Sequence, residues 1–223
     1  MQEFYYCERV DASFFAEPIN AFTNIFFIIA AYMSYRYMKQ QSSKLKVQNS
    51  IVMLSCILVC IGIGSFLWHT VALPWAMLAD VIPITLFIYV YLFSFVHYVL
   101  EKKMSVAVSA LVLFSIVNYG IENFVDKNLF NGSISYAPAL LSLFILALFS
   151  KKKEGISLFI SAIFLFLLSL VFRSIDFMVC ESLAFGTHFL WHTCNATMLY
   201  MLMVFLIKSS KPAEQRQIFR QKK

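Results

Sequence analysis

Seven long apolar stretches, separated by short polar connectors, dominate this chain and restrict its architecture. A helix of about 20 mostly apolar residues crosses the hydrocarbon core of a bilayer, and each stretch is close to that length. The sequence therefore predicts an all-α fold, a seven-transmembrane helix bundle over residues 1–207, followed by a basic cytoplasmic tail over residues 208–223. The predicted spans are residues 20–38, 49–70, 76–99, 104–121, 133–150, 156–177 and 185–207.

Composition argues against a soluble protein and against a nucleic-acid-binding protein. Hydrophobic residues make up 61% of the 223 positions and charged residues only 13%, which is typical of a chain embedded in a membrane. The net charge is +6, but the basic residues stand in short tracts between the apolar stretches. They therefore indicate membrane topology, and no obligatory protein partner is evident.

The distribution of charge also predicts how the bundle is oriented. Lys and Arg in the first, third and fifth connectors, the tail and the residues flanking them number 15 of the 18, whereas nine of the 12 acidic residues lie at the opposite ends. Basic connectors stay in the cytoplasm by the positive-inside rule. We therefore expect the N-terminus outside and the C-terminus in the cytoplasm, an alternation that seven spans satisfy and six do not.

Polar side chains from three predicted spans reach one depth near the outer surface. His69 ends the second span, His188 and His192 lie in the first turns of the seventh, and Asp80 lies about one turn into the third. With a helical rise of 1.5 Å per residue, all four fall within roughly the outer 10 Å of the bilayer. Ser65 precedes His69 by four residues and shares its helix face.

This set of residue types matches a catalytic zinc site. Three imidazoles with one open position are typical of catalytic zinc, which polarises a carbonyl and lowers the pKa of its water. A carboxylate such as Asp80 can then move the proton, and the Ser65 hydroxyl can donate to a developing oxyanion. These groups suffice to hydrolyse an amide or an ester. The alternative is that the histidines only hydrogen-bond across helices, as polar membrane residues often do.

Several motifs together resemble the alkaline ceramidases, which belong to a superfamily of seven-span hydrolases, the CREST superfamily, that also contains the progestin and adiponectin receptors. The resemblance extends from Tyr6 to His192, and its compact loops are more similar to bacterial members. The motifs are Tyr6-Cys-Glu8, Ala16-Glu-Pro-Ile-Asn20 followed by Thr23-Asn24, Gly64-Ser-Phe-Leu-Trp-His69, Asp80-Val-Ile-Pro83, Arg173-Ser-Ile-Asp176 with Cys180, and His188-xxx-His192.

The resemblance implies a zinc-dependent amidase that cleaves the N-acyl bond of ceramide, releasing a sphingoid base and a fatty acid. The resemblance assigns zinc binding to His69, His188 and His192. It also implies that Asp80 acts as acid and base and that Ser65 assists at the metal. Because many bacteria make no ceramide, a related N-acyl lipid remains an alternative substrate.

The resemblance also implies a calcium site near the N-terminus, but the chain departs from that pattern. Calcium-binding members resemble Asp-Trp-Cys-Glu-x-Asn with a later Glu, whereas this chain has Tyr5-Tyr-Cys-Glu-Arg-Val10. Only Glu8 and Glu17 match by side chain, and Asp11 is the carboxylate available to compensate. The sequence therefore supports calcium less than zinc.

Two further contacts are expected at the outer side. Cys7 and Cys180 both fall there and both lie in motifs shared with the family, so we expect a disulfide that ties the N-terminal segment over the site. The alternative is two free thiols that never meet. Arg173 and Asp176, three residues apart at the end of a span, are expected to form an ion pair.

Three functions remain open from the sequence. The first is an integral membrane amidase acting on ceramide or a related N-acyl lipid, located in a bacterial inner membrane with the site toward the periplasm. The second is a seven-span receptor with structural zinc, although the chain has no sizeable soluble domain for a ligand or effector. The third is a lipid-remodelling esterase of the same superfamily, which would use the same groups.

Overall fold

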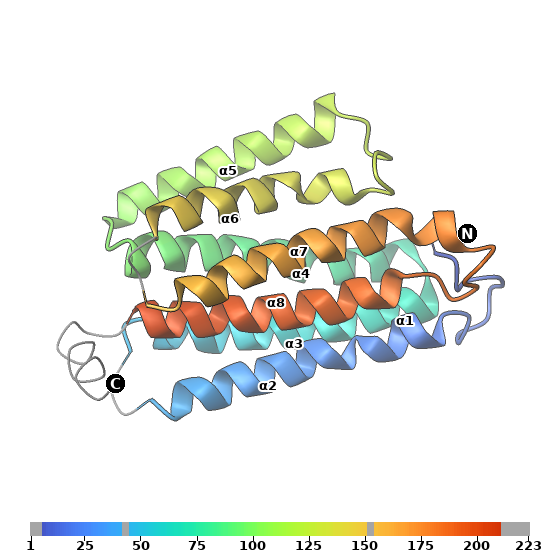
Figure 1. Ribbon diagram of the computed structural model, residues 1–223, viewed down its shortest axis with the longest axis horizontal. Coiled ribbons are helices and arrows are strands. Elements are labelled where there is room, and N and C mark those ends of the chain that lie inside the picture. Colours follow the sequence, from blue (N-terminus) through green and yellow to red (C-terminus); the bar gives the residue numbers. More distant parts are fainter. Residues whose placement is uncertain (1–5, 42–44, 151–153, 211–223) are drawn as a thin grey trace.

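The protein is a bundle of long helices that run side by side (Figure 1). The computed structural model describes residues 6–41, 45–150 and 154–210, and these residues contain helices and no strand. The all-helical prediction is therefore confirmed. In chain order the elements are α1 (Pro18–Thr23), α2 (Ile25–Lys39), α3 (Gln48–Val71), α4 (Pro74–Ser94), η1 (Phe95–Val99), α5 (Met104–Phe124), η2 (Ser133–Tyr136), α6 (Ala137–Phe149), α7 (Ile156–Ile175), η3 (Asp176–Val179) and α8 (His188–Ser209).

Five helical segments of the described residues are long and apolar enough to cross a membrane: Gln48–Val71, Pro74–Val99, Met104–Phe124, Ile156–Val179 and His188–Ser209. The chain is therefore an integral membrane protein. The segment Ser133–Phe149 is apolar but shorter. The first predicted span is divided at Asn24, whose side-chain amide donates to the carbonyl oxygens of Asn20 and Ala21 and separates α1 from α2.

Helix α8 lies at the centre of the bundle, where it packs against α7 and α2. In the most apolar part of α8, 61% of the residues are buried, whereas in that of α5 only 11% are. Helix α5 lies at the edge and packs mainly against α4, α6 and η1. A central helix is shielded from lipid, so it can carry polar side chains that a lipid-facing helix cannot. Helix α8 continues to Ser209, two residues beyond the predicted end of the bundle, and residues 211–223 of the predicted tail lie outside the described residues.

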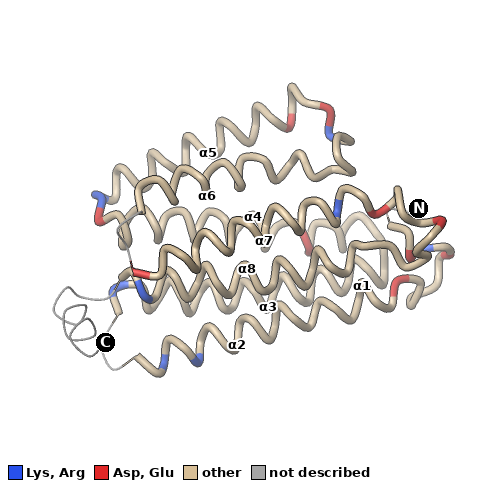
Figure 2. Tube along the Cα trace, in the orientation of Figure 1, with Lys and Arg blue, Asp and Glu red and all other residues tan. Residues whose placement is uncertain are grey.

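Charged residues separate toward the two ends of the bundle (Figure 2). Basic residues are concentrated at the end where α2 and α8 finish, which includes Arg36, Lys39 and Lys208. Acidic residues lie mainly at the opposite end, with the N-terminal segment and the start of α8. The polar residues of interest lie at this acidic end.

Candidate metal centre

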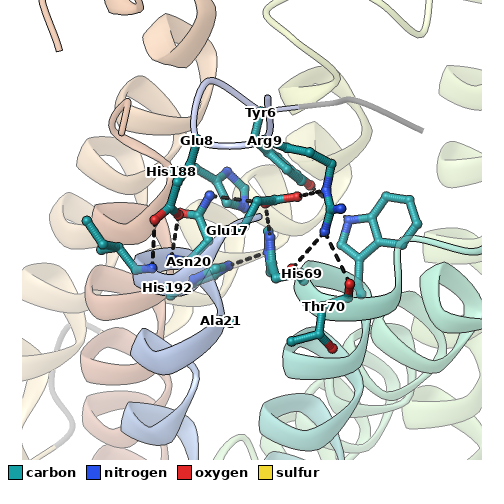
Figure 3. A network of polar contacts seen from close by, with 12 residues as sticks. Tyr6, Glu8, Arg9, Glu17, Asn20, Ala21, His69, Thr70, His188 and His192 are labelled. Carbon is teal, nitrogen blue, oxygen red and sulfur yellow. Dashed lines mark hydrogen bonds and ion pairs between the residues drawn. The ribbon is translucent and has the colours of Figure 1, made fainter. Parts of the chain in front are cut away.

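Three histidines from two helices meet at the acidic end of the bundle (Figure 3). His69 comes from the last turn of α3, and His188 and His192 come from the first two turns of α8. All three are at most 2% exposed, and one ligand atom of each lies within 4.8 Å of those of the other two. The structure therefore brings together the three histidines that the sequence singled out.

Hydrogen bonds at the Nδ1 atoms determine which nitrogens face the centre. His69 Nδ1 lies 2.5 Å from Glu17 Oε2, so it carries the proton and donates to the carboxylate. His192 Nδ1 lies 3.0 Å from Thr23 Oγ1. The Thr23 hydroxyl has its own carbonyl acceptors at Ile19 and Asn20, so it accepts the hydrogen bond from His192. In both rings Nε2 is then left with a free lone pair.

These lone pairs point at each other, which makes the site suitable for a cation. His69 Nε2 and His192 Nε2 are 3.1 Å apart, and two facing lone pairs at that distance repel unless a proton or metal ion lies between them. Ligand nitrogens at 2.0–2.1 Å from a tetrahedral zinc are separated by about 3.3 Å. His188 Nδ1 is buried and has no hydrogen-bond partner. The three imidazoles therefore form a metal-binding donor set compatible with zinc.

Glu17 connects the histidines to the N-terminal segment. Its Oε1 receives a hydrogen bond of 2.5 Å from Arg9 Nε, and Arg9 Nη2 also donates to the carbonyl oxygen of His69 at 2.9 Å. Burial raises the pKa of Glu17, but the hydrogen bonds from His69 and Arg9 and the charge of Arg9 hold that pKa below its ordinary value. Glu17 is therefore an ionised partner of a candidate metal ligand, an arrangement that orients the ring and raises its basicity.

Tyr6 covers the histidine cluster from the N-terminal side. Its ring centroid lies 4.0 Å from that of His188 and 4.9 Å from that of His69, and its hydroxyl accepts a hydrogen bond from Trp68 Nε1. Burial raises the pKa of Tyr6 to about 12, so the phenol stays protonated. A disulfide between the adjacent Cys7 and Cys180, with Cα atoms 5.4 Å apart, holds this cover in place.

Asp176 accepts hydrogen bonds from the start of α8 and forms no ion pair with Arg173. The prediction of that ion pair is therefore wrong. The backbone stays helical through Asp176, which begins the 3₁₀ turn η3, but both carboxylate oxygens of Asp176 accept hydrogen bonds from other groups. Its Oδ1 accepts from the backbone N–H groups of Thr187 and His188, and its Oδ2 accepts from that of Cys7. Gly186 is required beside it, because its φ is +61° and a Cβ there would lie 2.1 Å from Asp176 Oδ1.

Asp80 and Ser65 form a pair on neighbouring helices beside the cluster. The Ser65 hydroxyl donates to the Asp80 carboxylate, which lies near His69. Asp80 Oδ1 is buried without a hydrogen-bond partner. Gly64 makes this approach of α3 to α4 possible, because a Cβ there would lie 2.0 Å from the carbonyl oxygen of Ala79. The pair offers one unoccupied carboxylate oxygen for proton transfer.

An apolar cavity occupies the bundle core between α3, α4, α6, α7 and α8. Its cavity volume is about 90 Å³, and the space free of protein atoms is about 750 Å³ when the part open to the surroundings is counted. Along α8 the lining extends from Trp191, next to His192, to Leu202, a distance of about 16 Å along the helix axis. The other lining residues include Ile61, Phe87, Tyr136, Ala139 and Phe166. The apolar cavity therefore begins beside the histidines and continues along α8 into the core.

The carboxylates that were expected to hold calcium have separate partners. Glu8 accepts hydrogen bonds from the backbone N–H groups of Ile19 and Asn20 and so caps the N-terminus of α1. Asp11 is exposed and accepts from the N–H of Ser13. Both oxygens of Glu17 are engaged by Arg9, His69 and Asn20. Within the described residues these three carboxylates do not form a group with metal-ligand spacing.

Sequence reasoning missed four residues that support the cluster. Glu17 was considered only for calcium, and Tyr6, Arg9 and Thr23 were given no role, although each has a contact described above. The only signal for three of them was their place in motifs shared with the family. Arg9 stands at the variable position of the calcium-type motif and carried no signal.

The disulfide should stabilise the closed arrangement measurably. Cys7→Ser should lower the free energy of unfolding by about 2–5 kcal/mol, because the cross-link restricts the unfolded chain and holds the segment over the site. Thermal unfolding of the purified protein would measure this loss. Cys56→Ser, which alters a free cysteine on the exposed face of α3, is the control. An intact mass that does not rise by two hydrogens on reduction would contradict the bridge.

Comparison with known proteins places the chain in a family. Residues 3–222 match the family model described as Ceramidase, which covers nearly all of the 223 residues. None of the curated proteins matches the chain in sequence. Ceramidases hydrolyse the amide that links the acyl chain of ceramide to its sphingoid base. This chain therefore belongs to the ceramidase family and is an amide-bond hydrolase.

Proposed function

We propose that this protein is a zinc-dependent intramembrane amidase that hydrolyses the N-acyl bond of ceramide or a related N-acyl lipid. The observation that carries the proposal is the histidine cluster, in which Nε2 of His69 and Nε2 of His192 face each other at 3.1 Å. His188 and the Asp80–Ser65 pair adjoin it. Three imidazoles leave one position of a tetrahedral metal open, as in catalytic zinc sites.

Each group near the cluster has a role in amide hydrolysis. A zinc ion held there would polarise the acyl carbonyl and acidify a water molecule. The free Oδ1 of Asp80 is the group that takes a proton and later delivers it to the departing amine. Ser65 orients Asp80 through its hydrogen bond and keeps the second carboxylate oxygen engaged. Glu17 keeps the proton of His69 on Nδ1, so Nε2 remains a ligand.

The membrane setting supports a lipid substrate. The apolar core cavity begins at Trp191, one residue before His192, so a hydrocarbon chain inside it would place its polar end at the cluster. The cavity lining is almost wholly apolar, so a chain that leaves the bilayer for the cavity stays in apolar surroundings. An N-acyl lipid therefore fits both parts of the site.

The charge distribution supports an orientation in the membrane. We place the basic end of the bundle in the cytoplasm and the histidine cluster at the outer side, with seven spans that count α1 and α2 as one and η2 and α6 as another. Under the positive-inside rule the N-terminus is outside. The compact loops support a bacterial inner membrane with the site toward the periplasm.

The direct test is product analysis by mass spectrometry with purified protein in lipid vesicles. Ceramide, other N-acyl lipids and O-acyl lipids of equal chain length are supplied separately. The proposal expects a fatty acid and a free amine from at least one N-acyl lipid, and loss of both products on treatment with a zinc chelator. Cleavage of esters alone would favour a lipid-remodelling esterase, and no cleavage of any lipid would favour a receptor with structural zinc.

Glu17 should contribute to metal affinity without touching the metal. Glu17→Gln keeps the shape of the side chain but removes the charge that raises the basicity of His69, so zinc affinity should fall about 10–100-fold. Competition with a chelating dye measures this. Glu122→Gln, at an exposed position near the end of α5, should leave zinc affinity unchanged. Equal zinc affinity in the two variants would mean that Glu17 does not support the metal and serves only as the partner of Arg9.

A further inference from the structure

A second apolar cavity lies between α5, α6 and the end of α4, and none of its lining residues belongs to the histidine cluster. Its volume is about 310 Å³, larger than that of the core cavity. Val106, Leu113 and Ile145 line it and are between 45% and 63% exposed, so it is a groove open to the surroundings of the bundle. An apolar cavity of about 150 Å³ already stays dry and takes up an apolar molecule. The bilayer around this groove offers acyl chains as its occupants.

The groove is as long as one leaflet of the bilayer. Its lining extends along α5 from Val106 to Val117 and along α6 from Pro138 to Phe149. Each of these segments rises by about 16 Å, at 1.5 Å per residue. The hydrocarbon core of a bilayer is about 30 Å thick, so one leaflet contributes about 15 Å. An acyl chain of a lipid in the leaflet at the basic end of the bundle therefore fits the groove in length.

Lys102 stands at the end of the groove where α5 begins, which is the basic end of the bundle (Figure 2). It is the lining residue that carries a charge, and it forms no ion pair within the described residues. Ser142, another polar residue of the lining, already donates its hydroxyl to the carbonyl oxygen of Pro138. A lipid with its chain in the groove would thus meet one cation, at the depth of its headgroup.

The backbone holds Lys102 against the end of α4. There the helix widens into the π-helix η1, a rare form that is frequent at functional sites. Glu101 follows with a left-handed φ of +55°, which a residue with a Cβ adopts only at a cost in energy. The N–H of Lys102 then donates to the carbonyl oxygen of Val96, and its carbonyl oxygen accepts from His97 Nδ1. The side chain of Lys102 therefore starts from a fixed point beside the groove.

We propose that this groove binds an anionic phospholipid of the leaflet at the basic end, with one acyl chain between α5 and α6 and the phosphate on Lys102. An ammonium group donates charge-assisted hydrogen bonds to phosphate oxygens. A zwitterionic headgroup also has a phosphate, but its own cation competes with the lysine for it. Glu101 is the acidic neighbour in sequence and does not line the groove.

The bound lipid would complete the packing of α5. In the most apolar part of this helix only 11% of the residues are buried, so it gains contacts from a chain that fills the groove. The site goes beyond the proposed function, because it involves neither the histidines nor a reaction. Lipid binding by a protein that hydrolyses nothing would retain this site and exclude the amidase, and hydrolysis without it would do the reverse.

A lipid titration followed by native mass spectrometry tests the proposal on the full-length protein in detergent. Phosphatidylglycerol and phosphatidylcholine with identical acyl chains are supplied separately. The first phosphatidylglycerol should bind about 5–10-fold more tightly than the first phosphatidylcholine, the usual worth of one lysine near an anionic surface. Lys102→Gln should remove this difference and leave the binding of phosphatidylcholine unchanged, which also shows that the variant is folded. Lys102→Arg keeps the charge and should keep the difference.

Two other variants separate the charge from the groove. Lys39→Gln removes an exposed lysine at the same end of the bundle that lies over the ring of Tyr35, outside the groove, and should leave the binding of both lipids unchanged. Ala110→Phe fills part of the groove and should weaken the binding of both lipids. The two lysine variants change exposed positions, so they decide the question even if Ala110→Phe does not fold.

Three results would overturn the proposal. The first is equal affinity of the wild type for the two lipids. The second is an equal loss of phosphatidylglycerol binding in Lys39→Gln and Lys102→Gln, which would mean that the lipid contacts the basic surface as a whole. The third is a wild-type dimer in the same spectra that is lost in Ala110→Phe, because a second copy of the chain would then cover the groove.

Discussion

Replacing Asp80 with asparagine should lower the turnover number for amide hydrolysis roughly 10²–10⁴-fold, the usual contribution of general acid–base catalysis. Asparagine keeps the size of the side chain and its contact with Ser65 but cannot accept the proton. Asp80 Oδ1 is the buried carboxylate oxygen beside the histidines that has no partner. The three histidines and Glu17 are untouched, so the metal content should stay the same.

Rates measured under single-turnover conditions, together with elemental analysis of the same sample, test this expectation. Ser65→Ala should cost less than Asp80→Asn, because the hydroxyl acts only through its hydrogen bond to the carboxylate. Asp126→Asn, at an exposed loop position, is the matched control. Near-normal hydrolysis by Asp80→Asn would remove this residue from the mechanism, and loss of metal would make its role structural.

The parts of the fold that depend on local sequence were predictable. Long apolar stretches specify helices, and the rise per residue places His69, His188 and His192 at one depth whatever the detailed packing. The positions where individual helices begin and end were less predictable. The first span is divided at Asn24, whose side chain hydrogen-bonds to a carbonyl oxygen of the preceding helix α1. The turn before α6, Ser133–Tyr136, is a 3₁₀ helix. Neither feature changes the apolar pattern.

The support of the metal centre was not predictable from spacing alone. Glu17 reaches His69 across 52 residues of sequence because the N-terminal segment folds back over the end of α3. That path is set by Arg9, which binds the last carbonyl groups of α3, and by the Cys7–Cys180 bridge. The resemblance to calcium-binding family members suggested calcium for Glu8, Asp11 and Glu17, whereas the fold gives each carboxylate a different partner.

The failure of the Arg173–Asp176 prediction has a local cause. The backbone remains helical through Asp176, so the three-residue spacing is kept, but the Asp176 carboxylate accepts hydrogen bonds from three backbone N–H groups instead. Arg173 interacts with Tyr6 and Asp80. The Arg173 guanidinium lies over the rings of Tyr136 and Trp191, and its Nε has no hydrogen-bond partner.

The histidines themselves allow the largest expected change in metal content. His188→Ala should abolish stoichiometric zinc binding, and hydrolysis with it, because two imidazoles and solvent do not make the three-ligand set of a catalytic zinc site. The ring of His188 also stacks against Tyr6, so the alanine variant loses part of the cover as well. For this reason His188→Gln, which fills more of the space, should be measured beside it and should likewise lose zinc.

His97→Ala provides the control within the same chain, since it removes the fourth histidine. His97 lies in η1, at the far end of α4 from Asp80, and its Nδ1 pairs with the carbonyl oxygen of Lys102. The purified His97→Ala variant should keep about one zinc per chain, as expected for the wild type. Elemental analysis by mass spectrometry decides the outcome. Full zinc occupancy in both His188 variants would exclude this residue as a ligand, and loss in His97→Ala too would mean that zinc retention reports folding.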